Sequence, residues 1–274
     1  MIHADAALAR RLEGFICREW RQLADIAATL WPEKDVATME VGGGVALWLG
    51  DGGLVNVAAG MAMEGPIGET ELRRVEDFYV RWGAPPMLAT CPFADPTLFA
   101  VLGRRGWQLT EFENVLAMEL PSAAEGMVGL AAKLPPQIDL RVCATPAERA
   151  VFGRVAARGF SDDTAPGSAH VEFGDMMAAH EASILALAWV DGQPAGTGAL
   201  KIEDGIAWLS ADSTIPLFRR RGIQQALQRF RLQLAWAAGC RLAIIEAAVG
   251  SASQRNMERL GFRVIYPHLH FAKV

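Results

Sequence analysis

The stretch of sequence that decides the fold reads Pro216-Leu217-Phe218-Arg219-Arg220-Arg221-Gly222-Ile223-Gln224. It follows a strand-like segment and opens a long pattern with apolar residues three and four positions apart, which indicates an amphipathic helix. Three cations and a glycine therefore meet at a helix N-terminus. The first N–H groups of a helix have no acceptor inside it, and the helix dipole favours negative charge there. The stretch thus predicts a phosphate-binding turn.

The segments around this turn predict a mixed fold of strands and helices in the second half of the chain. Two Asp-Gly dipeptides, Asp191-Gly192 and Asp204-Gly205, favour the tight hairpins of a three-stranded antiparallel meander. A nearly continuous apolar run, residues 242–249, is typical of a central strand covered on both faces. The expected strands and helices of this half are residues 138–142, 145–158, 171–180, 184–190, 195–202, 206–214, 222–238, 242–249, 253–260 and 262–272.

The first half predicts a similar order of elements with weaker signals. Asp51-Gly52-Gly53 indicates a hairpin between two strand-like runs, and Asp95 is placed to cap a small helix. We expect one or two helices over residues 5–30. The remaining expected elements are strands at 37–48, 54–63 and 86–90, a helix at 69–82 and a terminal strand pair over 107–120.

A short internal similarity divides the chain into two domains. Residues 102–109 read Leu-Gly-Arg-Arg-Gly-Trp-Gln-Leu, and residues 257–264 read Met-Glu-Arg-Leu-Gly-Phe-Arg-Val, so that a glycine and an aromatic residue match near the end of each half. Turn and linker residues lie between Pro121 and Gln137. We therefore expect a first domain over residues 1–125 and a second over residues 137–274.

Composition narrows the functional classes. The chain has 274 residues, of which 51% are hydrophobic and 21% charged, and its formal net charge is −5. This balance is typical of a globular protein and provides no general attraction to nucleic acid or an anionic membrane. The sequence has no signal for a leader peptide or a membrane helix. Its cysteines are scattered, which argues against a zinc site and fits a protein of the reducing cytoplasm. We expect a cytoplasmic monomer or homodimer without a metal. The cysteines are Cys17, Cys91, Cys143 and Cys240.

The motifs of the second half resemble the GNAT N-acetyltransferase superfamily. Residues 219–224 resemble its Arg/Gln-x-x-Gly-x-Gly/Ala loop, and residues 251–262 resemble its later helix that ends in Leu-Gly-Phe. The resemblance covers about residues 137–274, and the first half looks like a degenerate copy of the same fold. It implies an α/β (α+β) protein of two GNAT-like domains in tandem, each a mixed, mostly antiparallel sheet flanked by helices.

The chain departs from the family pattern in both halves. Gln224 takes the place of the second Gly/Ala of the loop, where a side chain either obstructs the pyrophosphate or points away. Met257 replaces a frequent tyrosine that donates a proton to the leaving thiolate, and methionine has no proton to give. In the first half, Glu64, Glu69 and Glu71 surround the matching turn. Their charge repels a pyrophosphate, so we predict that this half does not bind CoA.

The resemblance implies acetyl-CoA as a cosubstrate that lies along the last meander strand, the basic turn and the short helix. The implied cofactor-binding residues are Ser213, Thr214, Arg219, Arg220, Arg221, Gly222, Ile223, Gln224, Ser253 and Asn256. Each also fits a structural role: the turn as an exposed basic helix start, Ser213 and Thr214 as an ordinary strand end, and Ser253 and Asn256 as capping or solvated helix residues.

Glu246 is the candidate catalytic residue because it is the one acid within the apolar run 242–249. A carboxylate in a central strand is costly unless it is paired or neutral, which suggests a general base with a raised pKa. The alternative is a structural pair with an arginine. His268 and His270 share one face of the last strand and either contact the acceptor or lie exposed. Tyr266 has the wrong spacing to replace the missing tyrosine.

These patterns together predict an acetyl-CoA-dependent N-acetyltransferase that acts on the amine of a small molecule or an amino acid-like acceptor. The alternative is a catalytically inactive CoA-binding sensor or scaffold, which Met257 favours. Nucleic-acid binding through the arginine cluster fits poorly, because the net charge is negative and the cluster is too short for a phosphate track.

Overall fold

The computed structural model describes residues 2–122, 137–161 and 165–273, and it divides into two compact units that interleave in sequence. The N-terminal unit comprises His3–Val115, Ala247–Val249 and Val264–Val274. The C-terminal unit comprises mainly Leu116–Glu246 and Gly250–Arg263. The expected linker between Pro121 and Gln137 lies almost wholly outside the described residues, and the domain bounds expected from the sequence stay a prediction.

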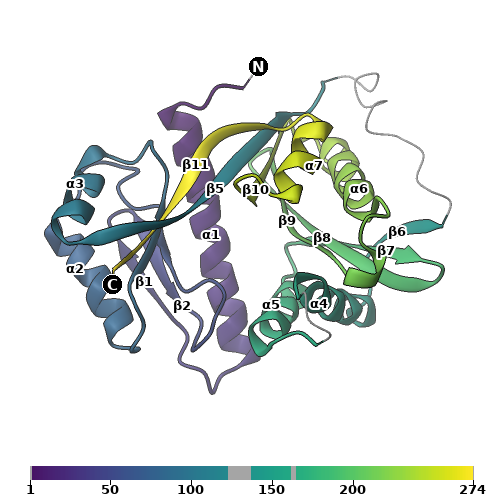
Figure 1. Cartoon of the computed structure of the whole chain (residues 1–274), viewed down its shortest axis with the longest axis horizontal. Helices are drawn as coiled ribbons and strands as arrows, with labels where there is room; N and C mark the ends of the chain where they lie inside the picture. The colour runs from purple at the N-terminus through teal and green to yellow at the C-terminus, as the bar shows by residue number, and fades with distance from the viewer. Residues whose placement is uncertain (1, 123–136, 162–164, 274) are drawn as a thin grey trace. The chain divides into compact units, whose positions relative to one another are not determined.

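The N-terminal unit begins with one long helix and continues with short strands (Figure 1). Its elements are α1 (Ala6–Leu30), β1 (Ala37–Val41), β2 (Gly44–Trp48), β3 (Ala58–Ala59), α2 (Glu69–Val80), β4 (Met87–Thr90), α3 (Pro96–Arg104), most of β5 (Trp107–Glu119) and β11 (Arg263–Lys273). The strand order here is β1-β2-β3-β4-β11-β5. As expected, Asp95 caps α3 through a hydrogen bond from the Thr97 N–H.

Two expectations about the first half are wrong. The hairpin turns at Gly42 and Gly43, both at positive φ, where Val41 pairs with Gly44, and not at Asp51-Gly52-Gly53. Only Ala58–Ala59 of the run 54–63 forms a strand. The Gly-Gly pair forms the turn because its backbone reaches the left-handed region without a steric penalty, and an apolar composition alone does not distinguish a strand from a buried loop.

The last strand differs most from the expectation, which placed it in the sheet of the second half. β11 is one unbroken strand, and it pairs antiparallel with β4, from Leu269 opposite Thr90 to Ala272 opposite Met87. β5 is likewise a single strand, and its residues change unit between Val115 and Leu116. The strand pair expected over residues 107–120 is therefore one strand, because the segment contains no turn signal.

A buried carboxylate ties α2 to β5 and to β11 within the N-terminal unit. Glu76 accepts hydrogen bonds from the Arg105 guanidinium at 2.9 Å and from the Trp107 indole at 3.0 Å, and it pairs with the Lys273 ammonium at 2.9 Å. The Arg105 guanidinium, with smaller effects from Lys273 and Trp107, lowers the pKa of Glu76 to about 2. The carboxylate therefore anchors the C-terminal strand to the unit.

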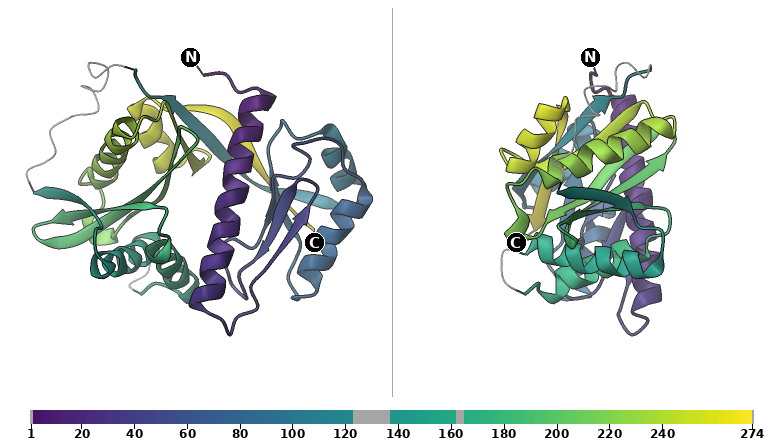
Figure 2. Two further views of the ribbon diagram at one scale, coloured as in Figure 1. Left: turned by 180° about the vertical axis from the view of Figure 1, so that it is seen from behind. Right: turned by 90° about the vertical axis from the view of Figure 1, so that its right-hand side faces the viewer.

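Over residues 138–260, the C-terminal unit has the order of elements that the sequence predicts. Its elements are the end of β5, β6 (Ile138–Val142), α4 (Pro146–Phe160), α5 (Ser168–Ala179), β7 (Ile184–Val190), β8 (Gln193–Glu203), β9 (Ile206–Thr214), a 3-10 turn (Pro216–Phe218), α6 (Ile223–Ala237), β10 (Leu242–Ala248) and α7 (Ala252–Leu260). The strand order is β5-β10-β9-β8-β7-β6. Helices α4 and α5 cover one face of this sheet, and α6 covers the other (Figure 2).

Two neighbouring parallel strands separate in the middle of this sheet. β10 pairs with β9 only from Leu242 opposite Ile206 to Ile244 opposite Trp208, although β9 continues to Thr214 and β10 to Ala248. Beyond Ile244 the facing backbone edges are therefore not bonded to each other. An extended ligand with amide groups can pair with such an edge.

A bulge in β9 redirects one acid toward α6. Ala211 and Asp212 lie opposite the single residue Gly198, and Ala211 has a φ of +51°. The fully buried Arg231 of α6 pairs with Asp212 and donates to the carbonyls of Ala199 and Ser210 at 2.7 and 3.2 Å. The guanidinium thus donates hydrogen bonds to strand carbonyls beside the bulge, where the regular pairing between strands is interrupted.

Replacing Glu76 with glutamine should lower the free energy of unfolding at pH 7 by about 2 kcal/mol, since it removes the charge-assisted hydrogen bonds to the partly exposed Arg105 and Lys273. Because the native pKa of Glu76 lies below its usual value of 4.5, its contribution is complete above pH 4.5 and is lost as the pH falls toward 2. Denaturant titrations at pH 7 and pH 3 should therefore show a smaller acid loss for Glu76→Gln than for wild type. Equal acid losses would contradict this assignment, and the exposed Glu33→Gln serves as control.

Replacing Gly198 with alanine should distort the bulge. A Cβ at Gly198 would lie 2.6 Å from Nε and 2.7 Å from Nη2 of Arg231. We expect the free energy of unfolding to fall by about 2 kcal/mol, the middle of the range for overpacked cores. Gly103→Ala in α3 is the matched control, because nothing lies within 4 Å of its Cβ position. Equal stability of the two variants in thermal unfolding would contradict the role of Arg231.

Candidate functional site

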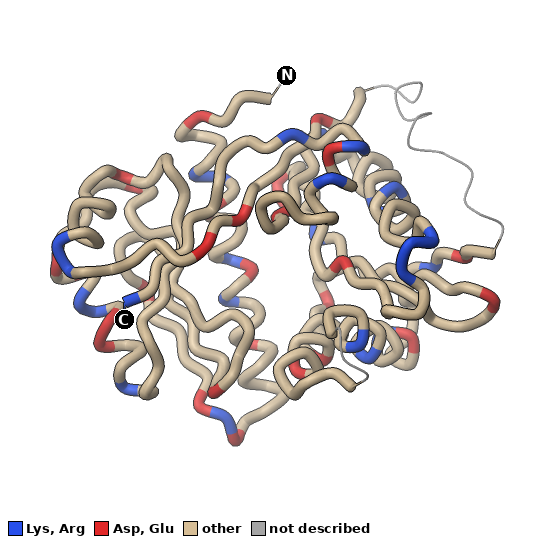
Figure 3. Tube along the Cα trace, in the orientation of Figure 1, with Lys and Arg blue, Asp and Glu red and all other residues tan. Residues whose placement is uncertain are grey.

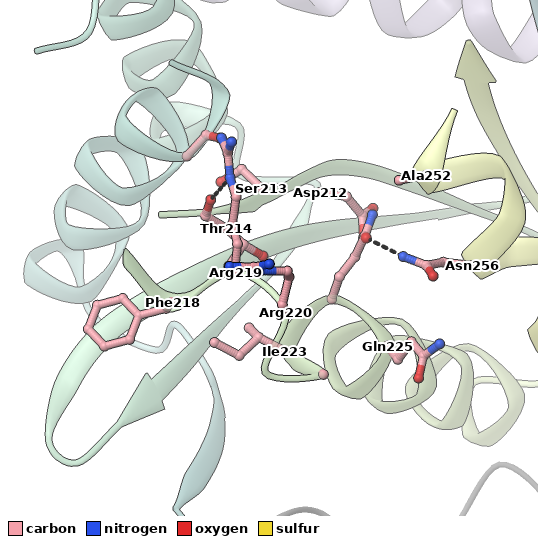
Figure 4. A pocket seen from close by; sticks show the side chains of 13 residues that line it. Asp212, Ser213, Thr214, Phe218, Arg219, Arg220, Ile223, Gln225, Ala252 and Asn256 are labelled. Carbon is pink, nitrogen blue, oxygen red and sulfur yellow. Dashed lines mark hydrogen bonds between the residues drawn. The ribbon is translucent and has the colours of Figure 1, made fainter. Parts of the chain in front are cut away.

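A cavity of ≈ 590 Å³ lies in the C-terminal unit, between the end of β9, the basic turn, the start of α6 and α7 (Figure 4). It gathers the predicted cofactor residues except Arg221 and Ser253, which do not line it. The lining residues are Gly159, Asp212, Ser213, Thr214, Phe218, Arg219, Arg220, Gly222, Ile223, Gln224, Gln225, Ala252 and Asn256. Gly159, Asp212, Phe218, Gln225 and Ala252 were not singled out from the sequence.

The basic turn leaves the N-terminus of α6 open. Arg220 and Gly222 have φ values of +64° and +80°, so the chain turns sharply before the helix begins at Ile223. No side chain caps the helix, and the Ala226 N–H donates to the Gly222 carbonyl. The N–H groups of residues 223–225 therefore have no acceptor within the helix, which suits an anion.

The three arginines of the turn, a continuous basic segment in Figure 3, have different surroundings. The Arg219 guanidinium donates to the carbonyls of Thr214 and Gly159, at 3.2 and 3.1 Å, and so clamps the end of β9 to α4. The Arg221 guanidinium lies 5.4 Å from the centre of the Phe218 ring. Arg220 lines the cavity, and no described residue forms an ion pair or hydrogen bond with its side chain. Arg220 is therefore the cation most available to a ligand.

Gln224, Ser253 and Asn256 form a polar link between α6 and α7. The Gln224 amide accepts from the Asn256 side chain at 2.8 Å and donates to the Ser253 hydroxyl at 3.5 Å. The side chain of Gln224, which stands where the family loop has its second Gly/Ala, is thus held against α7. The cap of α7 is Ser251, whose hydroxyl accepts from the Gln254 N–H.

The end of β9, Ser213 and Thr214, lines the cavity. The Ser213 hydroxyl is buried and lies 2.7 Å from the Thr197 hydroxyl and 3.4 Å from the Val155 carbonyl of α4. A Cβ at Gly159 would lie 2.7 Å from the Cβ of Ser213, so the glycine permits this close packing. The Ser213 side chain therefore holds the strand in place, and only its backbone can serve a ligand.

Asp212 is a lining residue that the sequence analysis missed. One carboxylate oxygen pairs with Arg231 and accepts from the Gln228 amide at 3.3 Å. The other, Oδ2, is buried and has no hydrogen-bond partner among the described residues. Burying a carboxylate oxygen without a hydrogen-bond donor destabilises the fold. This atom therefore marks a position where an N–H or ammonium donor would bind. Only the bulge turns it toward α6, and a single sequence carries no clear signal for that.

Glu246 lies on β10 beyond Ile244, the last residue of β10 that pairs with β9. It is half-buried, so a carboxylate here is less desolvated than a fully buried one. Its role as a general base stays a prediction. Met257, at the position of the missing tyrosine, is buried and apolar, and it offers no proton.

The histidines and the tyrosine of β11 belong to the N-terminal unit. His268 and Tyr266 both contact the buried Glu13, at 3.2 and 3.1 Å, and His270 lies 3.6 Å from Glu113. The contact with His270 lowers the pKa of Glu113. Of the two alternatives for His268, exposure on the strand is excluded, since the residue is buried.

The N-terminus of α2, the counterpart of α6 in the first half, already has a carboxylate beside it. The Glu71 carboxylate accepts from the N–H of the N-cap residue Gly68 at 2.9 Å. This backbone hydrogen bond lowers the pKa of Glu71, so the group is anionic at neutral pH. A pyrophosphate would have to displace a negative charge there, which supports the prediction that this half does not bind CoA.

Within the described residues, no helix is long and apolar enough to cross a membrane. The same residues contain no group of three His, Cys, Asp or Glu side chains placed to hold a metal ion.

Neither a family model nor a curated protein matches the sequence. Solved structures do match. A GCN5-related N-acetyltransferase from Kribbella flavida aligns with a TM-score of 0.62 at 21% identity over 92% of this chain and 95% of its own. A tandem GNAT protein from the clavulanic acid biosynthesis pathway aligns with a TM-score of 0.61 at 14% identity over 93% and 94%. A GCN5-related N-acetyltransferase from Sphaerobacter thermophilus aligns with 0.54 at 17% over 69% and 60%.

These structural alignments establish the fold, and at such low identities they say nothing of the activity. Two of the matches span nearly the whole chain, and one of them is described as a tandem GNAT protein. The Glu71 carboxylate lies at the N-terminus of α2, whereas the N-cap residue of α6 makes no side-chain hydrogen bond, so the two helix starts differ. The chain has the fold of the GNAT acetyltransferases, including that of a tandem GNAT protein.

Proposed function

We propose that the protein is an acetyl-CoA-dependent N-acetyltransferase that acts on the amine of a small molecule or an amino acid-like acceptor. The observation that carries the proposal is the cavity in the C-terminal unit, where an uncapped helix N-terminus, Arg220 and the separated edge of β9 meet. An anionic group on a long amide-bearing arm fits these three features together. A small anion would need only the first two.

The proposed position of CoA follows from these groups. The pyrophosphate binds the N–H groups of residues 222–225, with Arg220 compensating its charge. The pantetheine arm lies along β9, and its amides pair with the backbone of Ser213 and Thr214 as an added strand does. Because β9 and β10 separate beyond Ile244, the arm leads toward Asp212 and Glu246. No metal takes part in the proposed reaction.

The proposed chemistry is direct acyl transfer. The neutral amine nitrogen attacks the thioester carbonyl carbon, the C–S bond breaks, and the nitrogen loses a proton to a carboxylate. Glu246 is the proposed base. The Oδ2 atom of Asp212, which has no hydrogen-bond partner among the described residues, is the proposed acceptor for the amine or for a pantetheine amide. CoA leaves as a thiolate, which needs little acid assistance, so the apolar Met257 does not prevent turnover.

Arg220→Gln should weaken acetyl-CoA binding about tenfold in calorimetry, the loss expected for one charge-assisted hydrogen bond. Arg221→Gln is the matched control, since its side chain packs on Phe218 and does not line the cavity. Gly222→Glu should abolish binding, because it adds a negative charge and a strained φ of +80°. A wild-type protein that fails to bind acetyl-CoA would overturn the proposed function.

Glu246→Gln should reduce turnover at neutral pH about a hundredfold, within the range for removal of a general base, and should leave acetyl-CoA affinity unchanged. The assay is release of the CoA thiol in the presence of a panel of primary amines and amino acids. Glu181→Gln, in the exposed turn after α5, is the control. Normal turnover by Glu246→Gln would exclude the base role. Binding without turnover by wild type on any amine would favour a CoA-binding sensor or scaffold.

A further inference from the structure

The C-terminal unit contains a second cavity, of ≈ 560 Å³, which shares no lining residue with the first. Its volume is within the range of small-molecule sites. The walls come from α4, the start of α5 and the ends of β7, β8 and β9. The lining residues are Val151, Gly153, Arg154, Val155, Ala157, Arg158, Pro166, Val171, Asp175, Trp189, Pro194 and Ile215.

The cavity is walled mainly by apolar groups that the fold leaves open to solvent. Val171 is 40% exposed, and Trp189 is half-buried with the Arg141 guanidinium 5.6 Å from its ring centre. Helices α4 and α5 touch at Gly153 and Gly174, where an added Cβ on Gly153 would lie 2.8 Å from the Gly174 carbonyl oxygen. This contact fixes two walls relative to each other, so the cavity is built into the unit and needs no rearrangement to form.

Two arginines give the cavity a charge preference. Arg154 and Arg158 lie one turn apart on α4, and both line the cavity. No described residue forms an ion pair or hydrogen bond with either side chain. Asp175 on α5 also lines the cavity, so the lining side chains carry a net charge of +1 when it is ionised. Burial and the neighbouring Glu172 raise the pKa of Asp175, as expected for a carboxylate beside an apolar surface.

From this lining we propose that the second cavity binds an amphipathic monocarboxylate, with its carboxylate on Arg154 and Arg158 and its apolar body against Trp189 and the valines. Guanidinium groups recognise carboxylates through paired hydrogen bonds, and apolar walls favour a flat or branched hydrocarbon body. Asp175 disfavours ligands with several negative charges, such as nucleotides. This site does not depend on acetyl transfer or on CoA binding.

The test is a calorimetric titration with three probes of one shape: 4-phenylbutyrate, 4-phenylbutan-1-ol and 4-phenylbutylamine. We expect the acid to bind, the alcohol to bind about tenfold more weakly, and the amine to bind more weakly still. Equal binding of acid and amine, or no binding of the acid, would overturn the proposal.

Substitutions of the lining residues test whether 4-phenylbutyrate binds in this cavity. Arg158→Gln should weaken acid binding about tenfold and the more exposed Arg154→Gln about threefold, while Asp175→Asn should strengthen it, since a like charge is removed. Val151→Trp should block it by filling the cavity. Arg73→Gln, on the exposed surface of α2, controls for a general loss of positive charge.

Arg220→Gln separates the two cavities. Acid binding that is lost in Arg220→Gln and kept in Arg158→Gln would place the ligand in the first cavity and overturn the inference. The proposed function fails on a different result, namely absence of acetyl-CoA binding by wild type. Thermal unfolding of each variant identifies any loss of binding that follows from unfolding, and the retained alcohol affinity of Arg158→Gln provides a second check that the cavity is intact.

Discussion

The buried Arg231–Asp212 pair is the interaction on which the C-terminal site depends. A guanidinium with no exposure inside a small unit is tolerated only if its donors are satisfied, and here Asp212, Leu227, Ala199 and Ser210 accept from it. Two of these acceptors are strand carbonyls beside the bulge. The same charge therefore holds the irregular backbone of β9 and turns Asp212 toward the cavity. Removing it would leave an uncompensated carboxylate next to the proposed thioester position.

The two copies of the fold differ in what closes the N-terminus of one helix. In α2 the carboxylate of Glu71 accepts from the Gly68 N–H just before the helix, whereas the N-cap residue of α6 is Gly222, which makes no side-chain hydrogen bond. In the first copy, Glu76 instead stabilises the unit by accepting from Arg105 and Trp107 and by pairing with Lys273 near the C-terminus. A capped helix contributes to stability, and an open one is available for a ligand. This difference is the physical basis for the proposal that only the second copy binds CoA.

Much of the C-terminal unit could be predicted from sequence because its signals are local. The Thr145 cap and its Glu148 partner begin α4, Asp-Gly dipeptides form the hairpins, and apolar spacing sets the face of α6. Most of the predicted cofactor residues line one cavity for the same reason, since the turn from Arg219 to Gln224 is contiguous. The N-terminal hairpin was misplaced because Gly42-Gly43 and Asp51-Gly52-Gly53 are similar turn signals, and only strand pairing distinguishes them.

The sequence by itself determined the order of elements, the basic turn and the tandem arrangement, because propensity, periodicity and turn chemistry act over a few residues. Only the tertiary structure decided which arginines of the turn line the cavity, where Asp212 points, and that β11 pairs with β4. These outcomes depend on contacts between residues far apart in the chain, such as Arg219 with Gly159 and Lys273 with Glu76. A strand carries no mark of its partner, because any edge offers the same backbone groups.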